Sequence, residues 1–319
     1  MTAFRSPLHW LMALGICLSL VSCATRGHRG GELLPGARRV LFLGDSITHS
    51  GQYVEFVEAY FVTRFPERHV EFMNVGLPSE TVSGLSEPGH AGGQFPRPDL
   101  HERLARVLEK TKPDLVIACY GMNDGIYLPF NEERLGNFTN GLVRLRERVA
   151  GVGAKIIHVT PPTFDEVRGK GPGYGNTLDR YADWMLAQRA AGWDVADLHG
   201  PMNRFLAERR RVDPNFFLAG DGVHPGEAGH WIMAKQILLH LGGKDLENVE
   251  DSKAMLASHA NGERLLKLIQ QKQRMMKDAW LTDTGHKRPG MKKGLPLAEA
   301  RSKAAELEKQ IRELSGISR

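Results

Sequence analysis

Short apolar runs alternate with longer mixed segments along most of this chain. The apolar runs lie at 40–43, 70–75, 114–119, 155–159 and 193–198. A short apolar run that ends at glycine or a polar turn is typical of a strand buried on both faces. The segments that follow them are predicted to be helices at 53–65, 100–110, 132–149, 177–191, 202–209 and 227–241. Regular alternation of this kind predicts an α/β fold, with a parallel sheet between two layers of helices.

Polar clusters follow the first and third predicted strands, and another lies late in the domain. Ser46 ends the cluster after the first strand, Asn123 lies between glycines after the third, and Asp221 and His224 precede the last helix. Because the carboxyl ends of parallel strands share one rim, we expect these clusters to converge there. Each also has a purely structural interpretation: Ser46 as a helix cap, Asn123 in a turn, and Asp221 capping a loop while His224 faces solvent.

These residue types together suit ester cleavage, which needs an activated hydroxyl, a base and donors for the developing oxyanion. Ser46 supplies the hydroxyl, and His224 is the best candidate base. Asp221, three residues before His224, can accept a hydrogen bond from the imidazole and fix its tautomer. The side-chain amide of Asn123 can donate to an oxyanion. A backbone N–H in the loop after the second strand is a further candidate donor.

The three clusters resemble three of the four sequence blocks of the SGNH (GDSL-type) hydrolase superfamily. They are Gly44-Asp45-Ser46-Ile47, Gly121-Met122-Asn123-Asp124 and Asp221-Gly222-Val223-His224, in the family's order, and the resemblance spans residues 38–241. It implies a three-layer α/β/α sandwich with a flavodoxin-like, five-stranded parallel sheet. It also implies acyl transfer by a Ser46-His224-Asp221 triad, without a metal or an organic cofactor.

The remaining block departs from the family pattern. Members of the family usually carry a glycine five residues after the asparagine that ends the second strand, and its N–H helps to form the oxyanion hole. Counted from Asn74, that position is Ser79 here. A backbone donor does not require glycine, so the resemblance implies a hole formed by the N–H groups of Ser46 and Ser79 and the side chain of Asn123. The backbone conformation at Ser79 is the open question, and Gly76 is the residue that can compensate.

The first 23 residues are typical of a bacterial lipoprotein signal. Arg5 precedes an apolar segment at 8–21, which is too short to span a bilayer comfortably. Leu20-Val21-Ser22-Cys23 resembles a lipobox, which predicts secretion, a lipid anchor on Cys23 and, from the following Ala24, an outer-membrane address. The alternative is a plain signal peptide cleaved near Ala24. Cys119 is then the one cysteine of the folded domain, so no internal disulfide is expected.

The domain organisation follows from composition. Residues 24–37 are rich in glycine and arginine and are predicted to be a tether, residues 38–244 form the hydrolase domain, and residues 245–319 form a helical extension. The extension is predicted to contain helices at 251–280 and 296–314, joined by a linker at 284–294. We expect it to pack on the sheet domain or on a partner, and nothing in its sequence indicates catalysis.

Charge and composition narrow the function classes. The chain has 319 residues, 41% of them apolar, and a formal net charge of +5, part of which lies in the run His286-Lys287-Arg288. No basic helix is interleaved with aromatics, so nucleic acid is not an expected partner. His224 and His230 lack a third ligand at convincing spacing, so no metal site is predicted.

The leading hypothesis is a secreted, lipid-anchored serine esterase that hydrolyses short acyl esters, acetyl groups on carbohydrates above all. The substrate is then a small molecule or a polysaccharide ester. The alternatives are a lipase, lysophospholipase or thioesterase of the same fold, and a non-catalytic binding module of the cell envelope. The sequence leaves the oligomeric state open.

Overall fold

The structure is a computed structural model that describes residues 1–2, 33–34 and 36–316. The lipobox, all but the first two residues of the predicted signal, and most of the tether therefore lie outside the described residues. From Leu33 onward the chain forms one compact unit, which includes the C-terminal helices.

Five parallel strands form a single sheet, as the pattern of apolar runs predicts. In chain order they are β1 (Arg39–Gly44), β2 (Glu71–Asn74), β3 (Leu115–Cys119), β4 (Lys155–Val159) and β5 (Val195–Ala196). Their order across the sheet is β2-β1-β3-β4-β5, which is the flavodoxin-like arrangement. The fifth strand is shorter than the predicted 193–198, because only Val195 and Ala196 pair with β4.

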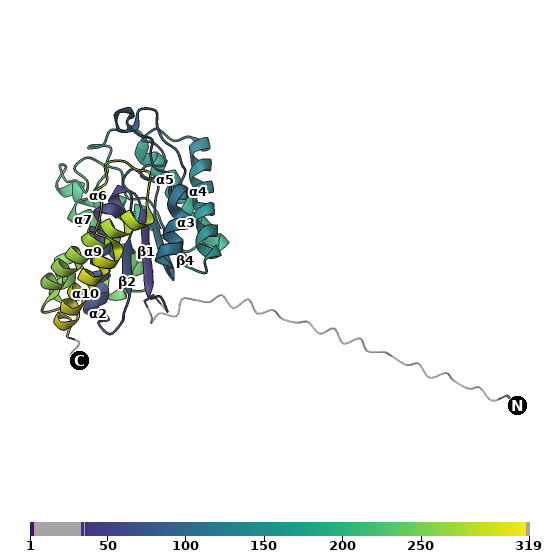
Figure 1. The fold of residues 1–319 in the computed structure, drawn as a ribbon. Helices are drawn as coiled ribbons and strands as arrows, with labels where there is room; N and C mark the ends of the chain where they lie inside the picture. The colour runs from purple at the N-terminus through teal and green to yellow at the C-terminus, as the bar shows by residue number, and fades with distance from the viewer. Residues whose placement is uncertain (3–32, 35, 317–319) are drawn as a thin grey trace. The chain divides into compact units, whose positions relative to one another are not determined.

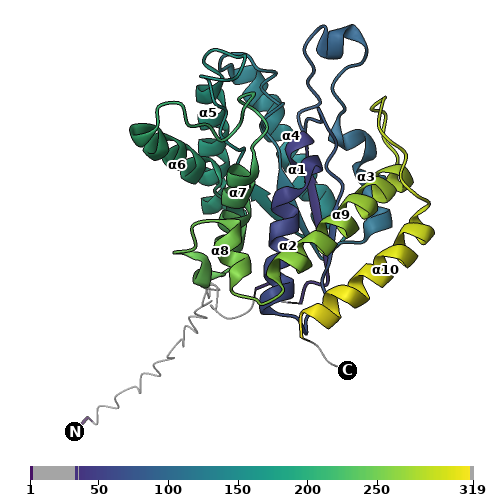
Figure 2. The same ribbon diagram turned by 90° about the vertical axis from the view of Figure 1, so that its left-hand side faces the viewer.

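Two layers of helices cover the sheet and confirm the three-layer α/β/α fold (Figures 1 and 2). One face carries α2 (Gln52–Arg64) and α7 (Glu227–His240), and the other carries α3 (Leu100–Thr111) and α4 (Glu132–Gly151). A stacked pair of rings, Phe138 and Tyr181, joins α4 to α5 (Tyr174–Ala187). α6 (His199–Val212) follows β5. The shorter elements are α1 (Ser46–Ser50) and the 3-10 helices η1 (His90–Gly93), η2 (Gln188–Ala191) and η3 (Lys244–Leu246).

The central strands are the most buried part of the molecule. Every residue of β3 is buried, and so are the last five residues of β1. Burial on both faces explains why these strands are almost wholly apolar rather than alternating. The core therefore holds the carboxyl ends of β1 and β3 side by side, with Gly44 opposite Cys119 in the strand register.

The C-terminal extension contains three α-helices where two were predicted. The predicted helix at 251–280 is wrong in one respect: it is divided into α8 (Ser252–Ala257) and α9 (Gly262–Thr284), and α10 (Leu297–Leu314) follows. The chain turns tightly at Gly262, where a Cβ would lie 2.1 Å from the carbonyl oxygen of Leu256. A close approach of this kind requires glycine, which a helical periodicity does not show.

The extension packs on the sheet domain through α9. This helix lies beside α2 and along the edge strand β2, and α10 lies on its outer side (Figure 2). Gln273 of α9 donates to the backbone carbonyl of Phe72 in β2 at 2.9 Å. A helix that covers an edge strand removes it as a site for strand pairing with other chains.

A buried lysine joins three helices at this interface. Lys272 of α9 forms ion pairs of 2.5 Å with both Glu58 of α2 and Glu308 of α10. Burial raises the pKa of Glu58, whose side chain is only 2% exposed. The charge of Lys272 opposes this effect, so the lysine is what makes a buried carboxylate tolerable between α2 and α9.

Among the helices of the described residues, none combines the length and the apolar character that a membrane-spanning helix requires.

We expect Lys272→Ala to lower the free energy of unfolding by about 3 kcal/mol, because it leaves the buried carboxylate of Glu58 without its counter-charge. Lys303→Ala is the matched control: it removes a lysine from an exposed pair with Glu299 on α10 and should change stability by less than about 1 kcal/mol. Urea denaturation of both variants measures the difference. Equal losses in the two variants would contradict a structural role for the buried pair.

Candidate active site

The candidate nucleophile lies where β1 turns into α1. A Cβ at Gly44 would lie 2.0 Å from Thr48 Oγ1 and 2.7 Å from the carbonyl oxygen of Cys119, so no other residue fits there. The helix cap is Asp45, not Ser46: its Oδ1 accepts a hydrogen bond of 2.9 Å from the backbone N–H of Ile47. Ser46 is therefore the first residue of α1, and its own N–H is one of the donors that a helix start leaves free.

The end of β2 holds α1 in place. Asn74 donates through Nδ2 to the carbonyl oxygen of Thr48 at 2.7 Å, and its Oδ1 accepts from the N–H of Gly76 at 2.9 Å. A Cβ at Gly76 would lie only 2.4 Å from the backbone nitrogen of His49. Gly76 thus lets the two backbones touch, which is a role other than the compensation for Ser79 that the sequence suggested.

The three residues of the predicted triad lie in a hydrogen-bonded row. Ser46 Oγ lies 2.8 Å from His224 Nε2, and His224 Nδ1 lies 2.7 Å from Asp221 Oδ2. The other oxygen of Asp221 accepts from the backbone N–H groups of Val223 and His224, at 2.9 and 2.8 Å. These bonds, mainly the one from the His224 side chain, lower the pKa of Asp221 to about 2 against the opposing effect of burial. Asp221 is therefore ionised at neutral pH.

A second serine–histidine pair lies on the same short helix. Ser50 Oγ lies 2.9 Å from His230 Nε2, close to the spacing of the first pair. Within the described part of the chain, His230 Nδ1 is buried and has no hydrogen-bond partner, so no carboxylate orients this ring. Burial lowers the pKa of His230 to about 4, and the ring stacks on Tyr53. The two pairs differ in the carboxylate, which only the first possesses.

Ser79 has the left-handed backbone conformation that explains the family's preference for glycine at this position. Its φ is +69°, in a region that favours glycine. The N–H groups of Ser46 and Ser79 donate to no other described residue, so both remain available to a ligand.

Asn123 is tied to the same loop and is buried. Its Nδ2 donates to the carbonyl oxygen of Glu80 at 3.1 Å, which leaves one amide hydrogen free. Its Oδ1 accepts from the hydroxyl of Tyr127 at 3.1 Å. The sequence does not reveal this orienting contact, because nothing in the spacing of Asn123 and Tyr127 signals it.

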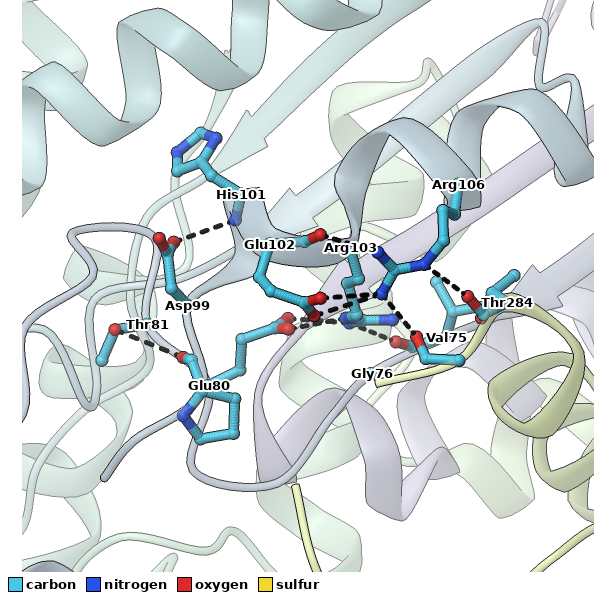
Figure 3. A network of polar contacts seen from close by, with 12 residues as sticks. Val75, Gly76, Glu80, Thr81, Asp99, His101, Glu102, Arg103, Arg106 and Thr284 are labelled. Carbon is cyan, nitrogen blue, oxygen red and sulfur yellow. Dashed lines mark hydrogen bonds and ion pairs between the residues drawn. The ribbon is translucent and has the colours of Figure 1, made fainter. Parts of the chain in front are cut away.

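A buried ion pair supports the loop that carries Ser79. Glu80 receives two hydrogen bonds from Arg103 of α3, at 2.6 and 2.7 Å (Figure 3). A third comes from the hydroxyl of Tyr120 at 2.7 Å. Arg103 also donates to the carbonyl oxygen of Val75. Each oxygen of Glu80 is thereby hydrogen-bonded, which is the condition under which a buried charge pair holds one geometry.

Asp124 connects the two loops that hold the expected donors. One of its oxygens accepts from the N–H groups of Val82 and Ser83, at 2.9 and 2.8 Å, and the other accepts from Gly121 N–H at 2.9 Å. The aspartate is fully buried. It therefore fixes the loop after β2 against the loop after β3, which carries Asn123.

The long loop at 82–98 forms part of the rim. Arg97 is paired bidentately with Glu87, at 2.6 and 2.7 Å, and its guanidinium lies over the ring of Tyr127. Arg97 is therefore occupied by Glu87 and is not free to bind an acidic substrate group. Two further aromatic residues near these loops, Tyr120 and Phe164, are buried in the core and therefore do not offer a ring to a sugar.

A family model described as GDSL-like Lipase/Acylhydrolase matches residues 42–232, more than half of the chain. The chain belongs to this family. A curated relative, an acetylxylan esterase from Geobacillus stearothermophilus, is 27% identical over 226 residues, which are 64% of this chain and 94% of the relative. The GDSL-like domain is thus shown to be a hydrolase of ester bonds.

Solved structures agree on the fold of this GDSL-like domain. LAE5, an α/β hydrolase from the metagenome of Lake Arreo, matches with a TM-score of 0.50 and 25% identity over 65% of this chain and 95% of its own. A gut microbial diltiazem-metabolizing enzyme matches with a TM-score of 0.51 and 22% identity, over 64% of this chain and 47% of the other. A catalytic mutant of the acetylxylan esterase Axe2 from G. stearothermophilus matches with a TM-score of 0.50 and 24% identity, over 64% and 94%.

Within the described residues, no group of three or more histidine, cysteine, aspartate or glutamate side chains is arranged to hold a metal ion. The two histidines considered as ligands, His224 and His230, contact Ser46 and Ser50 instead.

The aspartate that caps α1 gives a testable pH dependence. Burial, reinforced by the charges of Asp124 and Glu80, raises the pKa of Asp45 from 3.8 to about 7. Between about pH 4 and 7 the folded state holds a proton that the unfolded state has lost. Stability should therefore fall as pH rises through this range, by on the order of 4 kcal/mol.

Asp45→Asn keeps an acceptor for the N–H of Ile47 and cannot ionise. We expect this variant to lack that part of the decline, and to gain stability relative to the wild type as pH rises from 4 to 8. Urea denaturation across this range tests it, and parallel curves for the two proteins would exclude the effect.

Proposed function

We propose that this protein is a serine esterase in which Ser46 is the nucleophile, His224 the general base and acid, and Asp221 the residue that orients His224. The single observation that carries the proposal is the row of contacts from Ser46 Oγ through the imidazole to Asp221 Oδ2, at 2.8 and 2.7 Å. Ser46 attacks the ester carbonyl while His224 Nε2 takes its proton. His224 returns the proton to the leaving alcohol, and water then releases the acyl group by the same route.

Asp221 stabilises the charge that appears on His224 during this step. Its low pKa, about 2, keeps it anionic at the pH of the reaction. An anionic acceptor on Nδ1 holds the tautomer whose Nε2 lone pair faces Ser46, and it also stabilises the imidazolium. Three donors suit the oxyanion: the N–H groups of Ser46 and Ser79 and the free amide hydrogen of Asn123. Such donors lower the barrier when they are fixed in place before the reaction.

We propose acetyl groups on carbohydrates as the substrate. The named activity of the curated relative, acetylxylan esterase, supports this, since the match covers 94% of that protein. The openness of the site supports it too: the His224 and Asp221 side chains are 51% and 56% exposed. An exposed base leaves room for a bulky alcohol such as a sugar chain. The lipobox-like sequence supports the proposal that a lipid on Cys23 anchors the protein in the cell envelope. An experiment on this anchor needs the full-length chain.

Ser46→Ala should abolish hydrolysis of p-nitrophenyl acetate and labelling by a fluorophosphonate probe. The matched control is Ser50→Ala, which removes the serine of the second pair on the same helix and should retain both activity and labelling. Mass spectrometry of the labelled wild type locates the adduct. Wild-type turnover that persists in Ser46→Ala would exclude the mechanism, and an unlabelled, inactive wild type would favour a non-catalytic binding module.

A series of p-nitrophenyl esters from acetyl to palmitoyl tests the acyl group. We expect kcat/KM to be highest for acetyl and to fall by at least tenfold by the octanoyl ester. The opposite order would favour a lipase or thioesterase of the same fold. Release of acetate from acetylated xylo-oligosaccharides, compared with acetylated glycerol, tests the alcohol part of the substrate.

A further inference from the structure

The connection between α9 and α10 lies at the rim of the candidate active site, although it is outside the residues that the family model matches. It runs beside α3 (Figure 2), where Arg106 donates to the carbonyl oxygens of Thr284 and Gly285, at 3.0 and 3.4 Å (Figure 3). Lys110 of α3 pairs with Asp283 at 3.1 Å. These contacts fix the point at which the connection leaves α9.

Two cations of this region reach toward the site. Lys277 of α9 donates through Nζ to the carbonyl oxygen of His49 on α1 at 2.6 Å. The guanidinium carbon of Arg288 lies 5.3 Å from the ring centre of Phe95, whose ring contacts His90 in the loop at 82–98. The extension therefore bridges the helix that carries Ser46 and the long loop of the rim.

Neither of these cations has an ionic partner. Among the described residues, Lys277 and Arg288 form no ion pair, whereas Arg97, Arg103 and Arg106 of the same region are all paired with glutamates. Arg288 is half-buried, and its Nε, like Nδ1 of His286, is buried without a hydrogen-bond partner in the described structure. Burial lowers the pKa of both Lys277 and Arg288. The carboxylates of Asp278 and Glu55 act on Lys277, whereas burial alone lowers the pKa of Arg288. A partly desolvated guanidinium of this kind is a favourable place for an anion.

The cluster lies close to the candidate nucleophile. Lys277 contacts the backbone of His49, with 2.6 Å between Nζ and the carbonyl oxygen, and burial, followed by the charge of Lys277, lowers the pKa of His49 to about 4. His49 is three residues after Ser46 on α1, and residues at this spacing are neighbours on one helix face. Lys277 therefore lies beside the helix that carries the attacking hydroxyl, and Arg288 lies beside the long loop of the same rim.

We infer that the C-terminal extension supplies a cationic subsite that binds a carboxylate on the alcohol part of the ester substrate. Lys277 and Arg288 carry its charge, and the neutral imidazole of His286 is a further hydrogen-bonding group. This inference rests on the proposed esterase function and deepens it. It assigns to the enzyme acetylated sugars that carry an acidic residue, such as a uronic acid. Arg288 acts as a specificity residue, because a guanidinium can bind a carboxylate through two parallel hydrogen bonds.

Binding to an inactive protein tests the subsite without turnover. In the Ser46→Ala background, calorimetric titration should show that a xylo-oligosaccharide bearing one glucuronic acid binds at least tenfold more tightly than the neutral oligosaccharide of the same length. Adding Arg288→Ala should remove this preference. The matched control is Lys287→Ala, which removes the adjacent lysine, whose side chain is 79% exposed and lies 3.8 Å from Glu102, and it should leave the preference unchanged.

Kinetics of the active enzyme separate the subsite from the chemistry. Arg288→Ala should raise KM for the acetylated acidic oligosaccharide about tenfold and leave kcat/KM for p-nitrophenyl acetate within twofold. Arg288→Lys should bind the acidic oligosaccharide more tightly than Arg288→Ala does, because the lysine keeps a positive charge but cannot form the two parallel hydrogen bonds of a guanidinium. Equal binding of the acidic and neutral oligosaccharides would overturn the inference while leaving the esterase proposal intact. If the wild type does not hydrolyse p-nitrophenyl acetate but still binds the acidic oligosaccharide more tightly than the neutral one, the esterase proposal is overturned instead.

Discussion

The close contact of α1 with the ends of β1 and β2 is the constraint on which the site depends. Gly44 and Gly76 each lie where a Cβ would come within 2.4 Å of α1, at Thr48 or at His49. With both glycines in place, the helix starts directly at the end of a buried strand and Ser46 becomes its first residue. The rigid sheet thereby fixes the position of the Ser46 hydroxyl. The distance from Ser46 Oγ to His224 Nε2 is set by the position of α1 rather than by side-chain flexibility.

Around this contact the molecule places polar groups that oppose stability. Asp45 and Asp124 are buried near one another, Glu80 is buried with Arg103, and Ser79 holds a positive φ. Residues that strain the fold persist only where the surroundings over-determine them. Here the surroundings are the hydrogen bonds of Asp124 to two loops and of Glu80 to three donors. These buried polar contacts hold the loops that carry Ser79 and Asn123 in one conformation. The same burial of polar groups makes these loops costly to fold.

The sequence was most informative where one residue type has one physical use. Apolar runs predicted the strands, since only buried strands tolerate them, and Asp221 and His224 could be paired because three residues span one turn. The departure at Ser79 pointed to an unusual backbone, which its φ of +69° explains. Contacts between distant segments gave no local signal. Tyr127 orients Asn123, and Gly262 divides a helix, through neighbours that only the fold brings together.

The extension shows most clearly why such contacts escape a linear reading. Gln273 and Lys277 lie one turn apart on α9, so they share a face of the helix. Gln273 covers the edge strand through Phe72, and Lys277 reaches the backbone of α1 at His49. The same helix face thus closes the sheet and borders the site, so the position of the cationic residues beyond it depends on the packing of α9. A segment with no catalytic motif can shape the substrate site of this enzyme, because packing against β2 carries it to the rim.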